Sequence, residues 1–293
     1  MTVQITMLNA MASPDFAAAL DFQRDRGLKL LDLKDAILGR SLLDLTDAEA
    51  AQAAEMIDRR GLKVYCLSSV LFHADVEQGG PLFTAGLDDR VARLIELARL
   101  LRPQVLRLLG ATTSRRDQVA DAVAEVEQRH PWLIAAYQQA IDRIADAGFM
   151  ATIENEVRGC ILSSPAEVQR LFALINRPGR VMFTWDAQNM WQAGTFPTVA
   201  VYEQLRDLTG YVHLKGGQSV TTGGPLAWRC ALEDAGYDVP ALVQHAVASG
   251  RVAVICLNPP HGQPKPGYDY TNLLERDLRY VRQLIQNATS RTG

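Results

Sequence analysis

Short apolar runs alternate with longer amphipathic segments along the whole chain, one pair for roughly every 35 residues. The apolar runs are rich in valine, isoleucine and leucine, and most end at a polar residue or a glycine. Runs of this kind indicate strands buried on both faces, as in a parallel sheet. The eight strands predicted in this way comprise residues 3–9, 28–34, 63–70, 103–110, 149–156, 181–186, 211–215 and 251–258.

The segments between these strands carry apolar residues at helical spacing and show recognisable helix ends. Thr46 and Ser164 are predicted N-caps, and Glu49 and Glu167 stand three residues further on, as in a capping box. Ser13 is another predicted N-cap, because a proline follows it at the first helical position. The predicted helices comprise residues 13–26, 46–60, 87–101, 115–128, 131–147, 197–208, 226–235, 239–249 and 272–287, with one more that begins at residue 164.

Eight strands that alternate with helices, without any break in composition, predict a (β/α)₈ barrel that forms a single domain over residues 1–293. A doubly wound open sheet is the alternative. It usually has fewer strands, and the first strand here is not followed by the G-x-G-x-x-G turn of dinucleotide-binding proteins. In a barrel, the chemistry is expected at the C-terminal ends of the strands.

Composition and charge narrow the class of protein. Hydrophobic residues make up 48% and charged residues 22% of the chain, which is ordinary for a globular domain. A net charge of −3 gives no electrostatic reason to expect a nucleic-acid partner. The four cysteines form no C-x-x-C pair, which favours reduced thiols. No signal peptide and no apolar run near the ~18 residues of a membrane span is found, so a soluble cytoplasmic protein is expected.

Three consecutive strand ends carry side chains that can bind a metal ion. Glu154, Asp186 and His213 stand at the ends of the fifth, sixth and seventh predicted strands. Alternation along the fifth strand points Glu154 and Glu156 to the same side, toward the mouth of the barrel. Taken singly, a structural ion pair or a core histidine explains each residue, because buried carboxylates need cations, donors or a metal. Together, two carboxylates and an imidazole favour a divalent ion such as Mn²⁺, Mg²⁺, Co²⁺ or Zn²⁺.

The sequences around these strand ends resemble a known family. The segments GFMATIENE, RVMFTWDAQN, GYVHLKGG and SGRVAVICLNP are similar to the sugar phosphate isomerase/epimerase-like TIM barrels, the xylose isomerase-like superfamily. The resemblance covers the whole barrel. It implies that Glu154, Asp186 and His213 match three of the four usual metal ligands.

Three further residues match family positions. Lys215 corresponds to the family lysine, Asp32 to an acidic position on the second strand, and Arg107 to an arginine on the fourth. A homo-oligomer, most simply a dimer, is expected from family habit and from the commonness of two-fold symmetric assemblies.

The chain also departs from the family pattern. The family glutamate at the end of the eighth strand is replaced by Asn258, whose amide can bind a metal through its oxygen but cannot exchange a proton. The aspartate expected after His-x-Lys is absent, because Gly216 and Gly217 stand there. His261 follows Asn258 by three residues. It either takes an active role, as a substitute metal ligand or proton donor, or is an exposed histidine in a loop.

The resemblance and the donor set together predict a metal-dependent isomerase or epimerase acting on a sugar, keto-sugar or related polyol. A metal held by Glu154, Asp186 and His213, with Asn258 as a weak fourth ligand, is expected to bind substrate oxygens and stabilise an enediolate.

Acid–base roles are then expected of residues near the metal. Glu156 or Asp32 is predicted as the general base, and Lys215 or His261 as a proton donor or as the contact to an oxyanion. Glu154, a predicted metal ligand, is also predicted to be a catalytic residue. The expected substrate contacts are Lys34, Arg107, Gln188 and Asn189.

Three other functions are alternatives to this prediction. A lyase or dehydratase on a similar substrate needs only one base, so it tolerates Asn258. A metal-free barrel that serves as a binding or partner subunit is the second alternative, again because of Asn258. A metal-dependent nuclease of the same superfamily is disfavoured, because the chain is acidic and has only five histidines.

Overall fold

Eight parallel strands form the centre of the molecule, which a computed structural model describes over residues 3–292. Neighbouring strands follow the order β1-β10-β7-β6-β5-β4-β3-β2. A parallel bridge between Leu8 and Asp32 joins the two ends of this series, so the sheet closes into a barrel. The predicted (β/α)₈ barrel is confirmed. Its strands are β1 (Gln4–Met7), β2 (Leu30–Leu33), β3 (Lys63–Ser68), β4 (Val105–Leu109), β5 (Met150–Glu154), β6 (Val181–Asp186), β7 (Thr209–Leu214) and β10 (Val254–Leu257).

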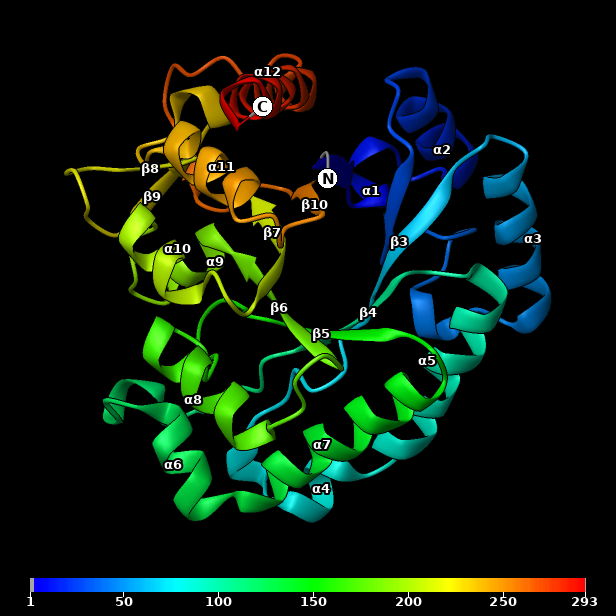
Figure 1. The fold of residues 1–293 in the computed structure, drawn as a ribbon, viewed down its shortest axis with the longest axis vertical. Coiled ribbons are helices and arrows are strands. Elements are labelled where there is room, and N and C mark those ends of the chain that lie inside the picture. Colours follow the sequence, from blue (N-terminus) through cyan, green and yellow to red (C-terminus); the bar gives the residue numbers. More distant parts are fainter. Residues whose placement is uncertain (1–2, 293) are drawn as a thin grey trace.

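Helices surround the barrel on the outside (Figure 1). In α5, the buried residues Val91, Leu94, Ala98 and Leu101 recur every three or four positions, so one face of the helix packs inward. The helices are α1 (Asn9–Ala12), α2 (Phe16–Asp25), α3 (Asp47–Asp58), α4 (Gly80–Thr84), α5 (Leu87–Leu101), α6 (Ala122–Arg129), α7 (Pro131–Asp146), α8 (Pro165–Ile175), α9 (Ala187–Gln192), α10 (Val199–Leu205), α11 (Val239–Ala248) and α12 (Leu273–Thr292). Among them, none is both long and apolar enough to cross a membrane.

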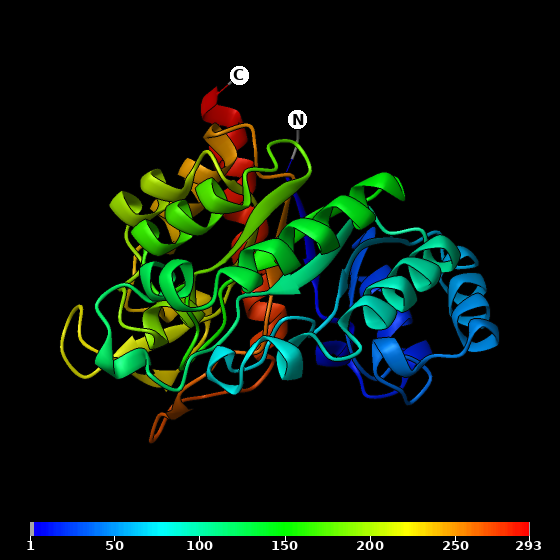
Figure 2. The same cartoon turned by 90° about the horizontal axis from the view of Figure 1, so that it is seen from below.

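The predicted helix at 226–235 is wrong. Leu226–Arg229 is strand β9, which pairs with β8 (Gly217–Ser219) and β11 (Gln263–Pro264) in a small three-stranded sheet. A short 3₁₀ turn, Leu232–Asp234, follows it. Pairing with segments before and after it in the chain overrides the local helical pattern, because strand formation depends on its neighbours. Figure 2 shows the yellow and orange segments of this region at the lower edge of the molecule, opposite the red end of α12.

Two predicted helix starts are corrected. Asp15, not Ser13, caps α2, because its Oδ1 accepts the Ala18 N–H at 2.8 Å. The predicted helix at 115–128 is interrupted: a 3₁₀ turn covers Arg116–Gln118, and α6 begins only after Asp121, which caps it.

The capping box at Thr46 and Glu49 is present as predicted, with both hydrogen bonds made. Ser164 caps α8, but the second half of its box is missing. The Glu167 carboxylate accepts the N–H of Ser163 instead, because it is turned toward the preceding loop.

Candidate metal and active site

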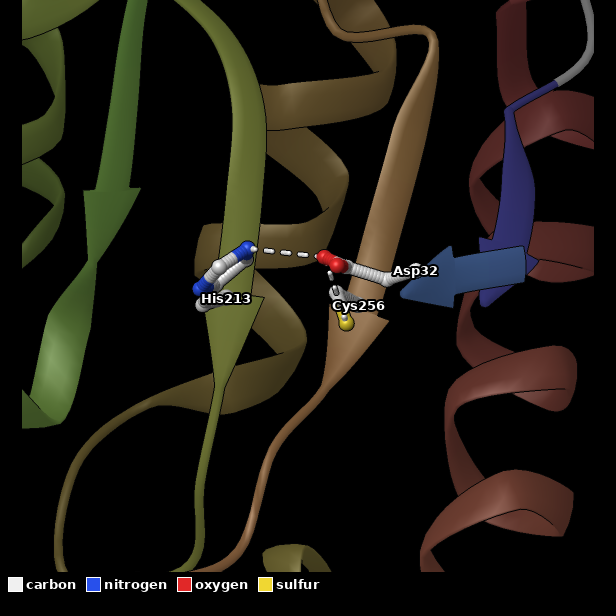
Figure 3. A group of neighbouring side chains, drawn as sticks. All are labelled: Asp32, His213 and Cys256. Atoms are coloured by element: carbon white, nitrogen blue, oxygen red, sulfur yellow. Dashed lines mark hydrogen bonds and ion pairs between the residues drawn. The ribbon is translucent and has the colours of Figure 1, made fainter. Parts of the chain in front are cut away.

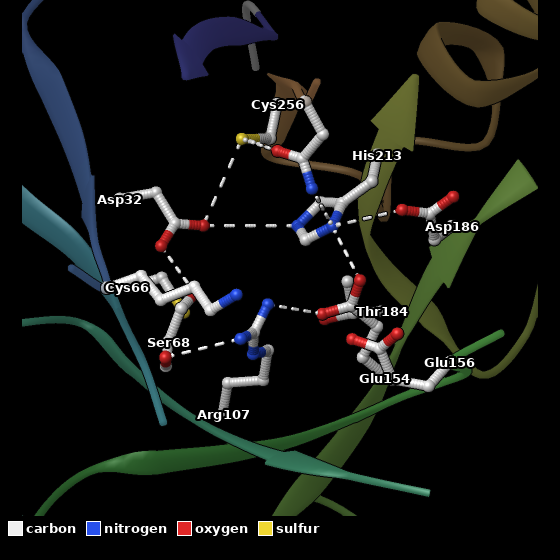
Figure 4. A network of polar contacts seen from close by, with 12 residues as sticks. Asp32, Cys66, Ser68, Arg107, Glu154, Glu156, Thr184, Asp186, His213 and Cys256 are labelled. Carbon is white, nitrogen blue, oxygen red and sulfur yellow. Dashed lines mark hydrogen bonds and ion pairs between the residues drawn. The ribbon is translucent and has the colours of Figure 1, made fainter. Parts of the chain in front are cut away.

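Barrel closure brings the three predicted ligands together. The His213 Nδ1 lies 2.9 Å from Glu154 Oε1 and 3.8 Å from Asp186 Oδ2. One ligand atom from each of these residues lies within 4.8 Å of the others, and all three side chains are buried. They stand at the C-terminal ends of β5, β6 and β7, because parallel neighbours end at the same edge (Figure 4).

Two basic side chains balance these carboxylates. Arg107 donates from one terminal nitrogen to Glu154 Oε2 at 2.6 Å, and the Lys215 Nζ lies 2.7 Å from Asp186 Oδ2. Burial favours the neutral form of Glu154, but His213 and Arg107 outweigh it and hold its pKa below the ordinary value. Burial also favours the neutral form of Asp186, but Lys215 and His213 hold the pKa of this carboxyl far below the ordinary value. Both carboxylates are therefore ionised.

The two carboxylate oxygens of Asp186 make different contacts. Its Oδ1 caps α9 by accepting the Asn189 N–H at 2.8 Å, which fixes the side chain. Its Oδ2 faces His213 and Lys215 and has no hydrogen bond of good geometry among residues 3–292. Asn155 holds the strand end in place, because its amide bonds both the N–H and the C=O of Asp186 at 2.9 Å.

Burial and the two neighbouring carboxylates shift the pKa of His213 in opposite directions. Burial alone would lower its pKa, but Glu154 and Asp186 raise it from 6.5 to about 9. The imidazolium is thus stabilised by folding, as long as no metal takes the place of the proton.

With divalent ions removed by a chelator, we expect stability to fall as the pH rises from about 6.5 to about 9. The raised pKa means that the stabilising protonation is complete below 6.5 and is lost as the pH passes through the pKa of the folded state. Urea unfolding across this interval measures the effect, and His213→Gln is expected to flatten the curve. A wild-type curve no steeper than that of the variant would contradict the assignment.

Asp32 lies behind His213 rather than beside the other carboxylates. Its Oδ2 is 3.9 Å from His213 Nε2 and 3.9 Å from Cys256 Sγ (Figure 3). Tyr211 donates its hydroxyl to the same oxygen at 2.7 Å, and Ser68 donates to the other. Burial raises the pKa of Asp32. At 3.9 Å the contact between Asp32 and His213 is an ion-pair distance and not a hydrogen bond, and His213 Nε2 has no hydrogen-bond partner among residues 3–292.

Lys215 is buried and its ammonium contacts three side chains, one of them through the ion pair with Asp186. Besides Asp186, its Nζ donates to Asn189 Oδ1 at 2.7 Å and lies 3.1 Å from His261 Nε2. Burial and the ammonium of Lys215 lower the pKa of His261 to about 4, so this ring is neutral and accepts. The Gln188 side chain holds the same loop by accepting the His261 N–H at 2.6 Å.

The glycines that replace the family aspartate are required by close packing. A Cβ on Gly216 would lie 2.1 Å from the carbonyl oxygen of Cys230, and one on Gly217 would lie 2.6 Å from Gln188 Nε2. A side chain at position 216 would therefore collide with the backbone of Cys230 and Ala231, whereas one at position 217 would displace the side chains of Gln188 and Leu226.

Asn258 reaches the ligand cluster. Its amide Nδ2 lies 2.9 Å from His213 Nδ1, and Cys256 Sγ lies 3.0 Å from its Oδ1. Turning the amide by 180° would exchange Nδ2 and Oδ1 and point Oδ1 toward His213 Nδ1. In that position the oxygen would be available as a metal ligand.

The remaining predicted residues fall into two groups. Glu156 is half-buried near the cluster, and burial and the Glu154 charge raise its pKa. Lys34 is also half-exposed, with its Nζ 3.7 Å from Asp35. By contrast, the Arg107 guanidinium is buried and also donates to the carbonyl oxygens of Ser68 and Ser69.

Sequence reasoning missed part of this network. Tyr211 and Cys256 each stand two positions before a predicted ligand, His213 and Asn258, and so share their inward direction. That alternation was the signal that could have found them. Alternation places Asn155 on the opposite side of its strand from Glu154, and nothing in the sequence indicates that it fastens the end of β6.

Comparisons with known proteins bear on the family and the fold of the chain. A family model described as xylose isomerase-like TIM barrel matches residues 22–284. A search of curated proteins gives no match.

Solved structures share the fold at low sequence identity. A xylose isomerase-like TIM barrel protein from Mycobacterium smegmatis in complex with magnesium superimposes with a TM-score of 0.69 at 14% identity, over 98% of this chain and 97% of that one. A probable 3-DHS dehydratase from Bacillus anthracis gives 0.69 at 12%, over 96% and 99%. A D-allulose 3-epimerase from Methylomonas sp. gives 0.66 at 17%, over 97% and 98%.

Proposed function

The chain belongs to the xylose isomerase-like TIM barrel family, and from that premise we propose that it is a metal-dependent isomerase or epimerase of a sugar, keto-sugar or related polyol. The observation that carries the proposal is the convergence of Glu154, Asp186 and His213 at the C-terminal ends of adjacent strands. Structural neighbours named as an epimerase and a dehydratase support the reaction class by analogy of fold alone.

The donor set fits a divalent ion in chemistry and in charge. Asp186 Oδ2 lacks a well-formed hydrogen bond, and two carboxylate oxygens and an imidazole nitrogen face a common point. Arg107 and Lys215 each pair with one of the two ligand carboxylates, and a divalent ion in place of the imidazole proton would add one more positive charge beside them.

Glu154, Asp186 and His213 would hold the ion, with Asn258 beside them. Such an ion supplies Lewis acidity toward the oxygens of a carbonyl and its neighbouring hydroxyl. The protein positions Asp186 through Asn155, which bonds its backbone, and through the cap that its Oδ1 forms on α9.

We assign the proton transfer to Glu156. Of the two carboxylates considered as base, Asp32 is engaged by Ser68 and Tyr211, whereas Glu156 is half-buried at the mouth. Its raised pKa suits a group that takes a proton from carbon and returns it. Lys215 then orients Asp186 and the His261 loop, because its ammonium pairs with the Asp186 carboxylate and hydrogen-bonds Asn189 and His261.

A lyase or dehydratase is the second candidate, and Asn258 favours it. A two-base epimerisation needs a titratable group on each side of the substrate, and an amide at the end of β10 supplies none. An elimination needs only one base, the role assigned to Glu156.

Solvent deuterium exchange tests the proposal. A panel of ketoses, aldoses and keto-polyols is incubated in D₂O with Mn²⁺, Mg²⁺, Co²⁺ or Zn²⁺, and proton NMR follows the hydrogen next to the carbonyl. We expect metal-dependent exchange with at least one compound, and elemental analysis near one ion per chain. Isomerised or epimerised product distinguishes the first candidate from loss of water. No bound metal and no exchange across the panel would indicate a binding subunit instead.

A further inference from the structure

A second group of side chains inside the barrel lies on the Nε2 side of His213, whereas the ligand cluster lies on its Nδ1 side. The group consists of Asp32, His213 and Cys256, and we call it the inner site (Figure 3). One ligand atom from each residue lies within 4.8 Å of the others, and all three side chains are buried. The proposed reaction uses neither Asp32 nor Cys256.

Three strands hold the inner site in place. His213 on β7 and Cys256 on β10 are partners in the register of these parallel strands, so they point to the same side of the sheet. Asp32 on β2 reaches them through the closure of the barrel, where its bridge with Leu8 joins β2 to the end of β1. Because strands position side chains more precisely than loops do, the three ligand atoms are in place before any ion binds.

The Nε2 atom of His213 is unpartnered. It is buried and has no hydrogen-bond partner in the described chain. Asp32 Oδ2 lies 3.9 Å away, and this approach is also the one ion-pair contact that Asp32 makes within residues 3–292. Buried charges are ordinarily paired or bound to a metal, so a cation between these two atoms would satisfy both.

The two ring nitrogens of His213 have different partners. Glu154 is paired with Arg107, so its carboxylate can only accept, and Nδ1 at 2.9 Å from Glu154 Oε1 is then an N–H donor. Nε2 is left as the nitrogen that can give a lone pair to an ion beside Asp32 and Cys256. His213 is thereby already oriented to bind at the inner site.

The sulfur gives the inner site a preference that the ligand cluster lacks. Cys256 Sγ lies 3.0 Å from Asn258 Oδ1, and with that amide turned by 180° Nδ2 would donate to the sulfur and favour the thiolate. A thiolate with an imidazole and a carboxylate is a donor set for Zn²⁺ and Cd²⁺, whereas a set of oxygens and one nitrogen suits harder ions.

The distances also suit such an ion. Zinc bonds of about 2.0–2.3 Å at tetrahedral angles place ligand atoms roughly 3.4–3.6 Å apart. Asp32 Oδ2 is 3.9 Å from both His213 Nε2 and Cys256 Sγ, so small movements of the side chains are enough.

We infer that the inner site binds a thiophilic divalent ion of the zinc class through Asp32 Oδ2, His213 Nε2 and Cys256 Sγ, in competition with an ion at the ligand cluster. The ion takes the place of the thiol proton and of any proton on Nε2, and these protons pass to solvent. Competition follows because a neutral imidazole has one lone pair and can give it on one side only. The inner site does not depend on the proposed function, but its effect on the ion at the ligand cluster does.

Titration with Cd²⁺ tests the inner site, because the ultraviolet charge-transfer absorption of a cadmium thiolate reports binding through sulfur, which the ligand cluster lacks. We expect the absorption to saturate at one Cd²⁺ per chain. Cys256→Ser is expected to lose it, and Asp32→Asn to weaken Cd²⁺ binding about 10- to 100-fold. Cys160→Ser is the matched control and is expected to keep it, since Cys160 is also a buried free cysteine but lies in the loop after β5.

Absence of the absorption in the wild type, or an absorption that survives in Cys256→Ser, would overturn the inference. If Cys256→Ser does not fold, as circular dichroism shows, the other titrations still decide. A Cd²⁺ affinity that Asp32→Asn leaves unchanged would equally overturn the inference.

Competition with Mn²⁺ tests the shared ligand. Saturating Mn²⁺ is expected to weaken Cd²⁺ binding at least about tenfold in the wild type, because it holds His213 at the ligand cluster. The same Mn²⁺ concentration is expected to have little effect in Asp186→Asn, whose cluster has lost a charged ligand, while the Cd²⁺ absorption itself persists.

The two experiments separate the inner site from the chemistry. If Mn²⁺ neither binds nor supports deuterium exchange while the Cd²⁺ absorption depends on Cys256, the proposed function alone is refuted. If Mn²⁺ binds and supports exchange but leaves the Cd²⁺ affinity unchanged, the two ions do not share His213 and the inference is wrong.

Discussion

Asp186→Asn is expected to lower the rate of substrate deuterium exchange about a thousandfold and to weaken divalent-metal binding. The asparagine keeps an oxygen to cap α9, so the local backbone should remain in place. It removes the negative charge at the atom that faces His213 and Lys215. A thousandfold loss corresponds to about 4 kcal/mol of transition-state stabilisation, within the range of metal-assisted charge stabilisation.

Asp277→Asn is the matched control for this variant. Asp277 is also a buried aspartate that accepts a backbone N–H, that of Leu232 at 2.7 Å, but it lies on α12 outside the ligand cluster. Burial raises its pKa to about 7, so an amide replaces it closely. We expect Asp277→Asn to retain metal binding and exchange. If Asp186→Asn binds Mn²⁺ as tightly as the wild type in calorimetry, Asp186 is not a ligand.

Glu154→Met is expected to lower the free energy of unfolding of the metal-free protein by about 3–5 kcal/mol. The substitution leaves the Arg107 guanidinium, which is 2% exposed, without its carboxylate partner. Removing one partner of a buried ion pair is far more costly than removing both. Urea unfolding at neutral pH with a chelator present measures the change.

A double-mutant cycle separates the pair from the site as a whole. Arg107→Met combined with Glu154→Met is expected to recover most of the stability lost in the single variant, because no unpaired charge remains. The exposed pair of Glu55 and Arg59 provides the control, and Glu55→Gln is expected to change stability by less than about 0.5 kcal/mol. If the double variant is no more stable than Glu154→Met, the loss comes from packing or from His213 instead.

The sixth strand shows how far local pattern is informative. The apolar run at 181–186 predicted its bounds to the residue, because a buried parallel strand needs apolar side chains on both faces. The segment at 226–235 shows the opposite. Its local pattern indicated a helix, but Leu226–Arg229 pairs with β8 and β11. These partners belong to the loops after β7 and β10, so the pairing is a tertiary contact that a local pattern does not encode.

In the cluster of charged residues, too, some features follow from local pattern and others from tertiary contacts. Inward alternation and parallel strand direction are local properties, so the sequence alone determined that Glu154, Asp186 and His213 would meet at one end of the barrel. The sequence left open whether a metal or side chains would balance their charge. The structure answers in part, because Arg107 and Lys215 each contact one carboxylate.

The position of Asp32 was decided only by the tertiary structure. Sequence reasoning placed it among the acid–base candidates, yet it lies behind His213 and accepts the hydroxyl of Tyr211, 179 residues away in the chain. Which inward side chains touch across the barrel depends on its closure and on the stagger of its strands. No local pattern of apolar and polar residues encodes these quantities, so the residues facing the site follow from the sequence and their pairing does not.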